Sequence, residues 1–264
     1  MNRITEKIQY LKRKGKKAFI PFITAGYPDI NSTPEVFAVL ERSGADIIEI
    51  GMPFSDPLAD GPTIQYSSDC AIKNGTTPSR VFETIKTIRS FSEVPILLFA
   101  YTNLILNFGI DEFMEQLSCS GGDGLLVPDL PVEESGPFYS RAKKHNIRMI
   151  FLISPLTSQE RMREIERRSD DFVYCVSIAG VTGAREQLFK KINSYLKTVR
   201  SVLTKPFVVG FGVSSGGDAR KIAELSDGVV VGSALIKRMQ HFNNKQDLYK
   251  NIHDFAMEIK NGIE

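Results

Sequence analysis

The chain has 264 residues, with 33 lysines and arginines against 31 aspartates and glutamates, and a formal net charge of +2 at pH 7. This length can bury a large core, and the near balance of charge, without a basic stripe, argues against nucleic acid as a partner. The polar residues 1–17 are not expected to form a signal peptide, and no apolar run approaches the length of a membrane span. Three cysteines at unrelated spacings favour the reducing cytoplasm.

Short apolar segments alternate with amphipathic segments from one end of the chain to the other. The apolar segments, each predicted to be a buried strand, are 18–24, 47–50, 96–100, 124–127, 149–153, 172–176, 207–210 and 228–231. The amphipathic segments, each predicted to be a helix, are 35–43, 79–90, 111–117, 133–145, 158–168, 185–203, 217–225 and 247–260, with a short helix over 234–239. A helical extension is expected before the first strand.

Eight short apolar strands, each followed by a helix, predict a parallel sheet that is covered on both faces. Such a sheet can stay open or can close into an eight-stranded barrel. Eight regular units over this length favour the closed form, a (β/α)8 barrel of the α/β class. No linker-like tract divides the chain and no sequence repeat is found, so a single domain over residues 1–264 is expected.

The second predicted strand contains a carboxylate, Glu49, between Ile48 and Ile50. Burying a charge is costly unless the group is paired or protonated, and the run around Glu49 holds no basic residue. The next loop contains three prolines, which give it a defined shape, and the carboxylates Asp56 and Asp60. Because barrel active sites lie at the C-terminal ends of strands and in the loops that follow, Glu49 and Asp60 are predicted catalytic residues.

Three glycine-rich segments follow the last three predicted strands, at 180–183, 210–216 and 232–233. Glycine lets backbone N–H groups approach an anion closely, and barrels frequently build a phosphate site from the loops after strands seven and eight. We therefore predict a phosphate site formed by Gly183, Gly212, Gly232 and Ser233. The glycines at 210, 212 and 216 do not have the spacing of a dinucleotide fingerprint, so a nucleotide-binding oxidoreductase is disfavoured.

Several of these segments together carry a family pattern. The sequence reads FITAGYP at 22–28 and EIGMPFSDPLADGPTIQ at 49–65, with further matches at 129–134, 180–183, 210–214 and 232–234. In this pattern the chain closely resembles the tryptophan synthase α subunit over essentially its whole length. The resemblance implies a (β/α)8 barrel lyase that cleaves indole-3-glycerol phosphate to indole and glyceraldehyde 3-phosphate by a retro-aldol reaction. This reaction belongs to the last steps of tryptophan biosynthesis.

The resemblance also implies a partner. In the family the α subunit forms an α2β2 heterotetramer with a β subunit that carries pyridoxal phosphate and turns the indole into tryptophan. No cofactor is therefore expected in this chain, and the spacing of its cysteines and histidines predicts no metal site.

Individual residues match family positions. Glu49 matches the general acid and base, Asp60 the acid that accepts the indole N–H, and Tyr174 an active-site tyrosine. Five apolar residues fall where the family packs the indole ring or supports Glu49, and they are Phe22, Ile64, Phe99, Leu126 and Ile153. Most of these five suit a plain barrel core equally well.

The proline-rich loop at 53–57 is a predicted interface. In the resembling family this loop docks on the β subunit, with Asp56 at the position of a salt-bridging acid. Pro53, Phe54 and Asp56 are therefore expected at the contact, with Phe54 exposed as an aromatic anchor and the loop of Thr182 closing beside them. The alternative is that Phe54 packs inward and the loop only caps the barrel.

Three residues depart from the family pattern. Ile178 lies in the segment where the family commonly has an arginine, Phe172 lacks the hydroxyl of a family aromatic, and Pro128 replaces a small residue. These departures concern loop ordering and communication with the partner, not the reaction class. The alternative functions are a free-standing indole-3-glycerol-phosphate lyase and another phosphosugar-binding barrel enzyme, with a non-catalytic barrel disfavoured because both Glu49 and Asp60 are retained.

Overall fold

The computed structural model describes residues 1–176, 185–210 and 212–264, without the side chains of 185–191. Within this part of the chain nine parallel strands form one sheet, in the order β5-β4-β3-β2-β1-β9-β8-β7-β6. The strands are β1 (Ala18–Thr24), β2 (Ile48–Gly51), β3 (Ile96–Phe99), β4 (Gly124–Leu126), β5 (Arg148–Ile150), β6 (Leu152–Ile153), β7 (Val173–Cys175), β8 (Phe207–Val209) and β9 (Gly228–Val231).

Strands β5 and β6 are two halves of one barrel strand, which was expected to run unbroken over 149–153. They are separated by Phe151, whose backbone N–H donates to the Ser169 hydroxyl at 3.1 Å instead of to a neighbouring strand. β5 pairs with β4 and β6 pairs with β7, so this interrupted strand joins the two ends of the sheet order. The predicted (β/α)8 barrel is therefore confirmed.

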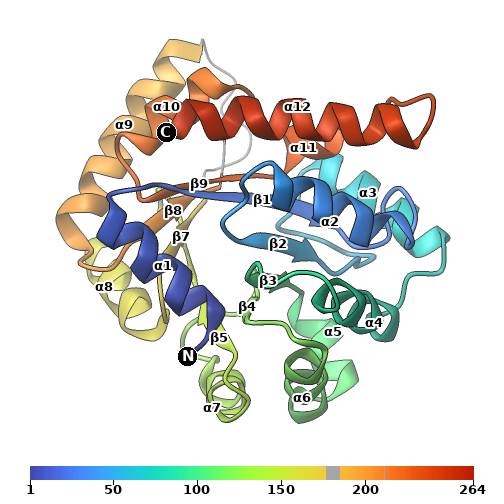
Figure 1. Cartoon of the computed structure of the whole chain (residues 1–264). Helices are drawn as coiled ribbons and strands as arrows, with labels where there is room; N and C mark the ends of the chain where they lie inside the picture. The colour runs from blue at the N-terminus through green and yellow to red at the C-terminus, as the bar shows by residue number, and fades with distance from the viewer. Residues whose placement is uncertain (177–184, 211) are drawn as a thin grey trace.

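Helices surround the sheet, as Figure 1 shows. They are α1 (Arg3–Lys14), α2 (Ser32–Arg42), α3 (Pro62–Lys73), α4 (Pro78–Arg89), α5 (Thr102–Phe108), α6 (Ile110–Ser120), α7 (Gly136–Lys144), α8 (Gln159–Arg168), α9 (Arg185–Val202), α10 (Gly216–Ala223), α11 (Ser233–Arg238) and α12 (Lys245–Ile263). Helices α3 and α5 were not predicted. The buried face of α3 combines Ile64 and Ala71 with two serines, and α5 has only seven residues, so neither shows an apolar stripe.

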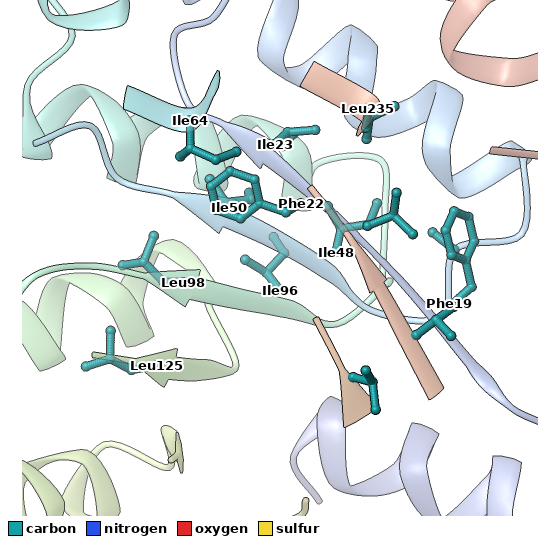
Figure 2. Close-up of a cluster of buried hydrophobic side chains, with 14 of the residues drawn as sticks. Phe19, Phe22, Ile23, Ile48, Ile50, Ile64, Ile96, Leu98, Leu125 and Leu235 are labelled. Atoms are coloured by element: carbon teal, nitrogen blue, oxygen red, sulfur yellow. The ribbon is translucent and has the colours of Figure 1, made fainter. Parts of the chain in front are cut away.

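Two layers of apolar side chains hold the barrel together because side chains alternate along each strand. Ile47 packs in the inner layer, whereas Ile48 and Ile50 pack in the outer layer between strands and helices. Figure 2 shows part of the outer layer, where side chains of β1 to β4 gather. Helix α1 closes the end of the barrel where the strands begin. It packs Ile4 and its neighbours on the same helix face into the inner layer.

An aspartate locks each of four strand pairs at the end of the barrel opposite the strand C-termini. In each pair the aspartate exchanges two hydrogen bonds with one residue of the preceding strand, donating its backbone N–H and accepting with its side chain. The pairs are Asp46 with Phe19, Asp123 with Ile96, Asp170 with Met149 and Asp227 with Phe207. The four locks recur on every second barrel strand, a regularity that the sequence did not reveal.

Candidate active site

Glu49 lies in β2, opposite Phe22 of β1 and Leu97 of β3. Its side chain is completely buried, with 0% exposure. One carboxyl oxygen accepts a hydrogen bond from the Tyr174 hydroxyl at 3.4 Å, and the other has no partner among the described residues. Burial raises the pKa of Glu49 to about 8, the charge of Asp60 adds to this rise, and the Tyr174 bond opposes it. Glu49 is thus a carboxylic acid that is protonated near neutral pH.

Tyr174 reaches Glu49 from β7 across the barrel interior. Its ring passes close to Gly210, where a β-carbon would lie 2.4 Å from the tyrosine oxygen. Only glycine leaves room for the hydroxyl at that point, so Gly210, directly after β8, allows Tyr174 to reach Glu49. Burial and the neighbouring carboxyl of Glu49 both raise the pKa of Tyr174, so this hydroxyl acts as a neutral donor.

Asp60 lies at the end of a loop whose backbone N–H groups are hydrogen-bonded. The Asp60 N–H donates to the Pro57 carbonyl at 2.9 Å, and the Ala59 N–H donates to the Tyr101 hydroxyl at 3.2 Å. Burial raises the pKa of Asp60 to about 6, and a hydrogen bond from Tyr101 opposes that rise. At neutral pH Asp60 is therefore mainly ionised while Glu49 is mainly protonated, so the two carboxyl groups differ in protonation state.

A cavity of about 430 Å³ opens at the C-terminal ends of the strands. Its lining residues are Phe22, Glu49, Ala59, Asp60, Gly61, Ile64, Phe99, Pro128, Leu152, Tyr174, Val176, Gly210, Gly212, Val213, Val230, Gly232, Ser233 and Ala234. The structure thus brings together the predicted catalytic residues, the predicted phosphate-site residues that it describes, and three of the predicted ring-pocket residues. Acidic groups, apolar walls and glycines share one cavity.

Leu126 and Ile153 were also expected in the ring pocket, but among the described residues neither lines the cavity. Leu126 packs in the inner layer of the barrel. Ile153 belongs to the outer layer, under the helices, because side chains alternate along β6. The preceding residue, Leu152, takes the inward position and lines the cavity instead.

Two predicted residues, Thr182 and Gly183, lie outside the described residues, as does Ile178. Phe172 packs in the inner layer of the barrel, on the same face of its strand as Tyr174. Pro128 lines the cavity after β4.

Sequence reasoning missed Tyr101, whose side chain is buried at the end of β3 and bonds to the Asp60 carboxyl. Its place directly after a predicted strand was the available signal, because barrel active sites lie there.

The loop at 53–57 is only partly as expected. Pro53 is buried and Asp56 is exposed. Phe54 is half-buried and stacks on Tyr101, with ring centroids 5.1 Å apart and planes at 28°, so the prediction of an exposed anchor is corrected. The exposed apolar side chain next to this loop is Leu58, at 91% exposure.

Comparison with known proteins identifies the family. A family model described as "Tryptophan synthase alpha chain" matches residues 8–264. The tryptophan synthase alpha chain of Thermoanaerobacter sp. is 44% identical over 98% of this chain and 99% of its own length, and that of Geotalea daltonii is 41% identical over 100% and 99%. The chain belongs to the tryptophan synthase alpha chain family.

Solved structures agree. The tryptophan synthase subunit alpha of Legionella pneumophila superposes with a TM-score of 0.92 at 33% identity, covering 100% of this chain and 98% of that chain. An aminoacrylate-bound form of tryptophan synthase from M. tuberculosis gives 0.88 at 29% identity, with both chains covered completely. As a member of the tryptophan synthase alpha chain family, the protein is a lyase that cleaves indole-3-glycerol phosphate in tryptophan biosynthesis. None of the described helices is both long and apolar enough to cross a membrane.

Proposed function

We propose that Glu49 and Asp60 divide the chemistry of the cleavage between them. The observation that carries this proposal is the fully buried Glu49 carboxyl, which lines the cavity with a pKa of about 8 and has one oxygen without a partner among the described residues. A buried acid without a basic partner is costly to the fold, so its position calls for a functional reason. Asp60 lines the same cavity with a lower pKa of about 6.

The reaction breaks the bond between the indole ring carbon and the adjacent glycerol carbon. In our proposal the protonated Glu49 donates its proton to the ring carbon, and a Glu49 oxygen takes the proton of the glycerol hydroxyl as that carbon becomes an aldehyde. The ionised Asp60 accepts the indole N–H and stabilises the positive charge that develops on the ring. Tyr174 holds the Glu49 carboxyl through its 3.4 Å hydrogen bond.

The two ends of the substrate differ in chemistry, and so do the two kinds of cavity wall. We assign the indole ring to the apolar wall of Phe22, Ile64, Phe99 and Leu152, in which Phe22 and Phe99 meet edge to face at 5.8 Å. We assign the phosphate to the backbone around Gly212, Gly232 and Ser233, together with Gly183. Glu49 lines the same cavity as both walls.

We further propose that the chain is a single domain and works in the cytoplasm with a β subunit as an α2β2 heterotetramer. The chain's nine described strands form one sheet, which supports the single domain. Its three cysteines are unpaired, which is typical of a reducing compartment. The exposed Asp56 and Leu58 beside the cavity suit a partner contact, with the loop of Thr182 closing against it. Pyridoxal phosphate belongs to that β subunit, because the two carboxyl groups supply the proton chemistry in this chain.

The experiment that tests the proposed roles is an assay of indole release from indole-3-glycerol phosphate by the purified chain. Glu49→Gln keeps the shape of the side chain and removes its proton, so kcat should fall at least ~10²-fold, as for the loss of general acid–base catalysis. Glu83→Gln, on the exposed face of α4, is the matched control and should keep the wild-type rate. Normal indole release by Glu49→Gln would refute the assignment.

A further inference from the structure

Tyr101 has a fixed position between the catalytic strands and the proline-rich loop. It lies two residues after the end of β3, at the N-cap position of α5, and it is 2% exposed. Its ring stacks on Phe54 at 5.1 Å and meets Phe99 edge to face at 5.8 Å. One stacked and one edge-to-face aromatic neighbour leave the ring little freedom to rotate.

The hydroxyl of this ring makes two contacts with the end of the loop. It accepts the Ala59 N–H at 3.2 Å and donates to the carboxyl of Asp60. One side chain therefore holds both the backbone just before Asp60 and the Asp60 carboxyl itself. The Asp60 backbone is also held by the Pro57 carbonyl and by the Gln65 side chain, whereas the hydrogen bond with Tyr101 acts on the pKa of the carboxyl itself.

We propose that Tyr101 is a positioning residue that orients the Asp60 carboxyl, and that Phe54 holds Tyr101 in place from the loop. The chain of contacts runs from the loop surface through two stacked rings to the acid. A change in the packing of Phe54 would thereby reach Asp60 without any contact between Phe54 and the substrate. This inference rests on the proposed role of Asp60 in the cleavage.

The pH dependence of the rate is a second readout of the contact between Tyr101 and Asp60, and it depends on the titratable groups around them. Two titratable groups lie near Asp60: Glu49 on β2 and Tyr174 on β7. The charge of Asp129, after β4, raises the pKa of Tyr101. Burial raises the pKa of Asp60, and the Tyr101 hydrogen bond is the contact that lowers it again. Loss of that bond leaves Asp60 less ionised near neutral pH, so the acid limb of the rate profile should move to higher pH.

The test is Tyr101→Phe, which removes the hydroxyl and keeps the ring and its stack on Phe54. We expect kcat for indole release to fall roughly 10-fold, as for the loss of one hydrogen bond to a charged group, with KM changed by less than about 2-fold. The matched control is Tyr139→Phe, which removes a tyrosine hydroxyl bonded to Asp170 at 3.1 Å at the opposite end of the barrel. The control should keep the wild-type kcat and pH profile.

Phe54→Ala tests the other half of the inference. It should lower kcat and move the acid limb in the same direction, because Tyr101 loses the ring that supports it. A wild-type kcat and pH profile for Phe54→Ala would leave Tyr101 acting without the loop and would overturn that half.

A background substitution separates this inference from the proposed function. In Asp60→Asn the addition of Tyr101→Phe should cause no further loss of kcat, because Tyr101 acts through the carboxyl. The same 10-fold loss in both backgrounds, or an unchanged kcat and pH profile for Tyr101→Phe alone, would overturn the inference. A fully active Asp60→Asn variant would instead overturn the proposed role of Asp60. Where Asp60→Asn turns over too slowly to measure, the shift of the acid limb in Tyr101→Phe decides.

Discussion

Burial of the Glu49 carboxyl serves the proposed chemistry but lowers the stability of the fold when the group is ionised. The carboxyl is completely buried and accepts one hydrogen bond from the part of the chain that the structure describes, so its ionised form destabilises the fold. In the unfolded chain the same group has an ordinary pKa of 4.5, whereas in the fold it is about 8. The folded chain therefore binds a proton that the unfolded chain releases between these two values.

This difference predicts how stability depends on pH. Relative to Glu49→Gln, the free energy of unfolding of the wild type should fall as pH rises from about 4.5 to about 8, by on the order of 4 kcal/mol, and then level off. Urea unfolding of both proteins at a series of pH values measures this difference. Asp60 titrates in both proteins, so the comparison isolates Glu49. A difference that does not change with pH would show that Glu49 stays ionised in the fold.

At the same scale, some site residues could be read from the sequence and others could not. Glu49 was predictable because a charge inside an apolar strand is conspicuous. Ile153 was misplaced and Leu152 overlooked because both are apolar, and only the pleat of β6 decides which one faces inward. Tyr101 was overlooked because its role depends on contacts with a loop that is more than forty residues away.

At the scale of elements, the loop after β8 shows why the phosphate site needs glycine. Gly212 has a φ of +68°, a left-handed conformation that other residues adopt at a cost, and it lines the cavity. A β-carbon at this position would meet no described atom within 4 Å, so the space beside it is open. The proposed occupant of that space is the phosphate group.

Substitution of Gly212 by alanine should therefore separate binding from folding. Gly212→Ala and the control Gly15→Ala, which has a φ of +62° and equally open surroundings at the end of α1, should each lose about 1 kcal/mol of stability. Only Gly212→Ala should raise the KM for indole-3-glycerol phosphate and weaken inhibition by inorganic phosphate. Equal KM values for both variants would place the phosphate elsewhere.

The loop between β2 and α3 is the element assigned to partner contact. With a cognate β subunit present, Asp56→Ala should lower the activation of indole release and leave the rate of the isolated chain nearly unchanged, because Asp56 is exposed outside the cavity. Asp254→Ala, on the exposed face of α12, is the control and should be activated like the wild type. Gel filtration of the mixture shows whether a complex forms. If no complex forms and the rate does not rise, the chain is a free-standing lyase.

At the scale of the whole molecule, the fold was largely predictable and its locks were not. Eight apolar segments with helices between them predicted the barrel, because buried parallel strands are nearly all apolar. Helix α3 is not predictable from an apolar stripe because its inner face is partly polar. The four aspartate locks are not predictable because their partners are backbone groups, which leave no pattern in the sequence.

The lock at Asp123 should be the most sensitive to substitution. Its carboxyl accepts from the Ile96 N–H at 2.8 Å and pairs with Arg89 at 2.6 Å and Arg3 at 3.0 Å, and the side chains of Asp123 and Arg89 are 3% and 9% exposed. Asp123→Asn leaves Arg89 buried without its charge partner, which should cost about 3–5 kcal/mol in urea unfolding. Asp111→Asn, which breaks an ion pair with Arg141 that is 48% exposed on both sides, should cost less than about 1 kcal/mol. Equal losses would mean that the lock adds nothing beyond a surface pair.

The aspartate locks also suggest an order of events as the chain folds. Each lock joins residues only 20 to 27 positions apart, whereas the pairing of β1 with β9 joins Ala18 to Gly228. Closing that long loop costs about 2 kcal/mol more entropy than closing a short one, so the locked strand pairs form early and the seam between β1 and β9 forms late. Phe22 comes from one side of this seam, and Gly232 and Ser233 come from the other. A partly folded chain can therefore have its locks in place and still lack a substrate cavity, and binding competence arrives only with the last seam.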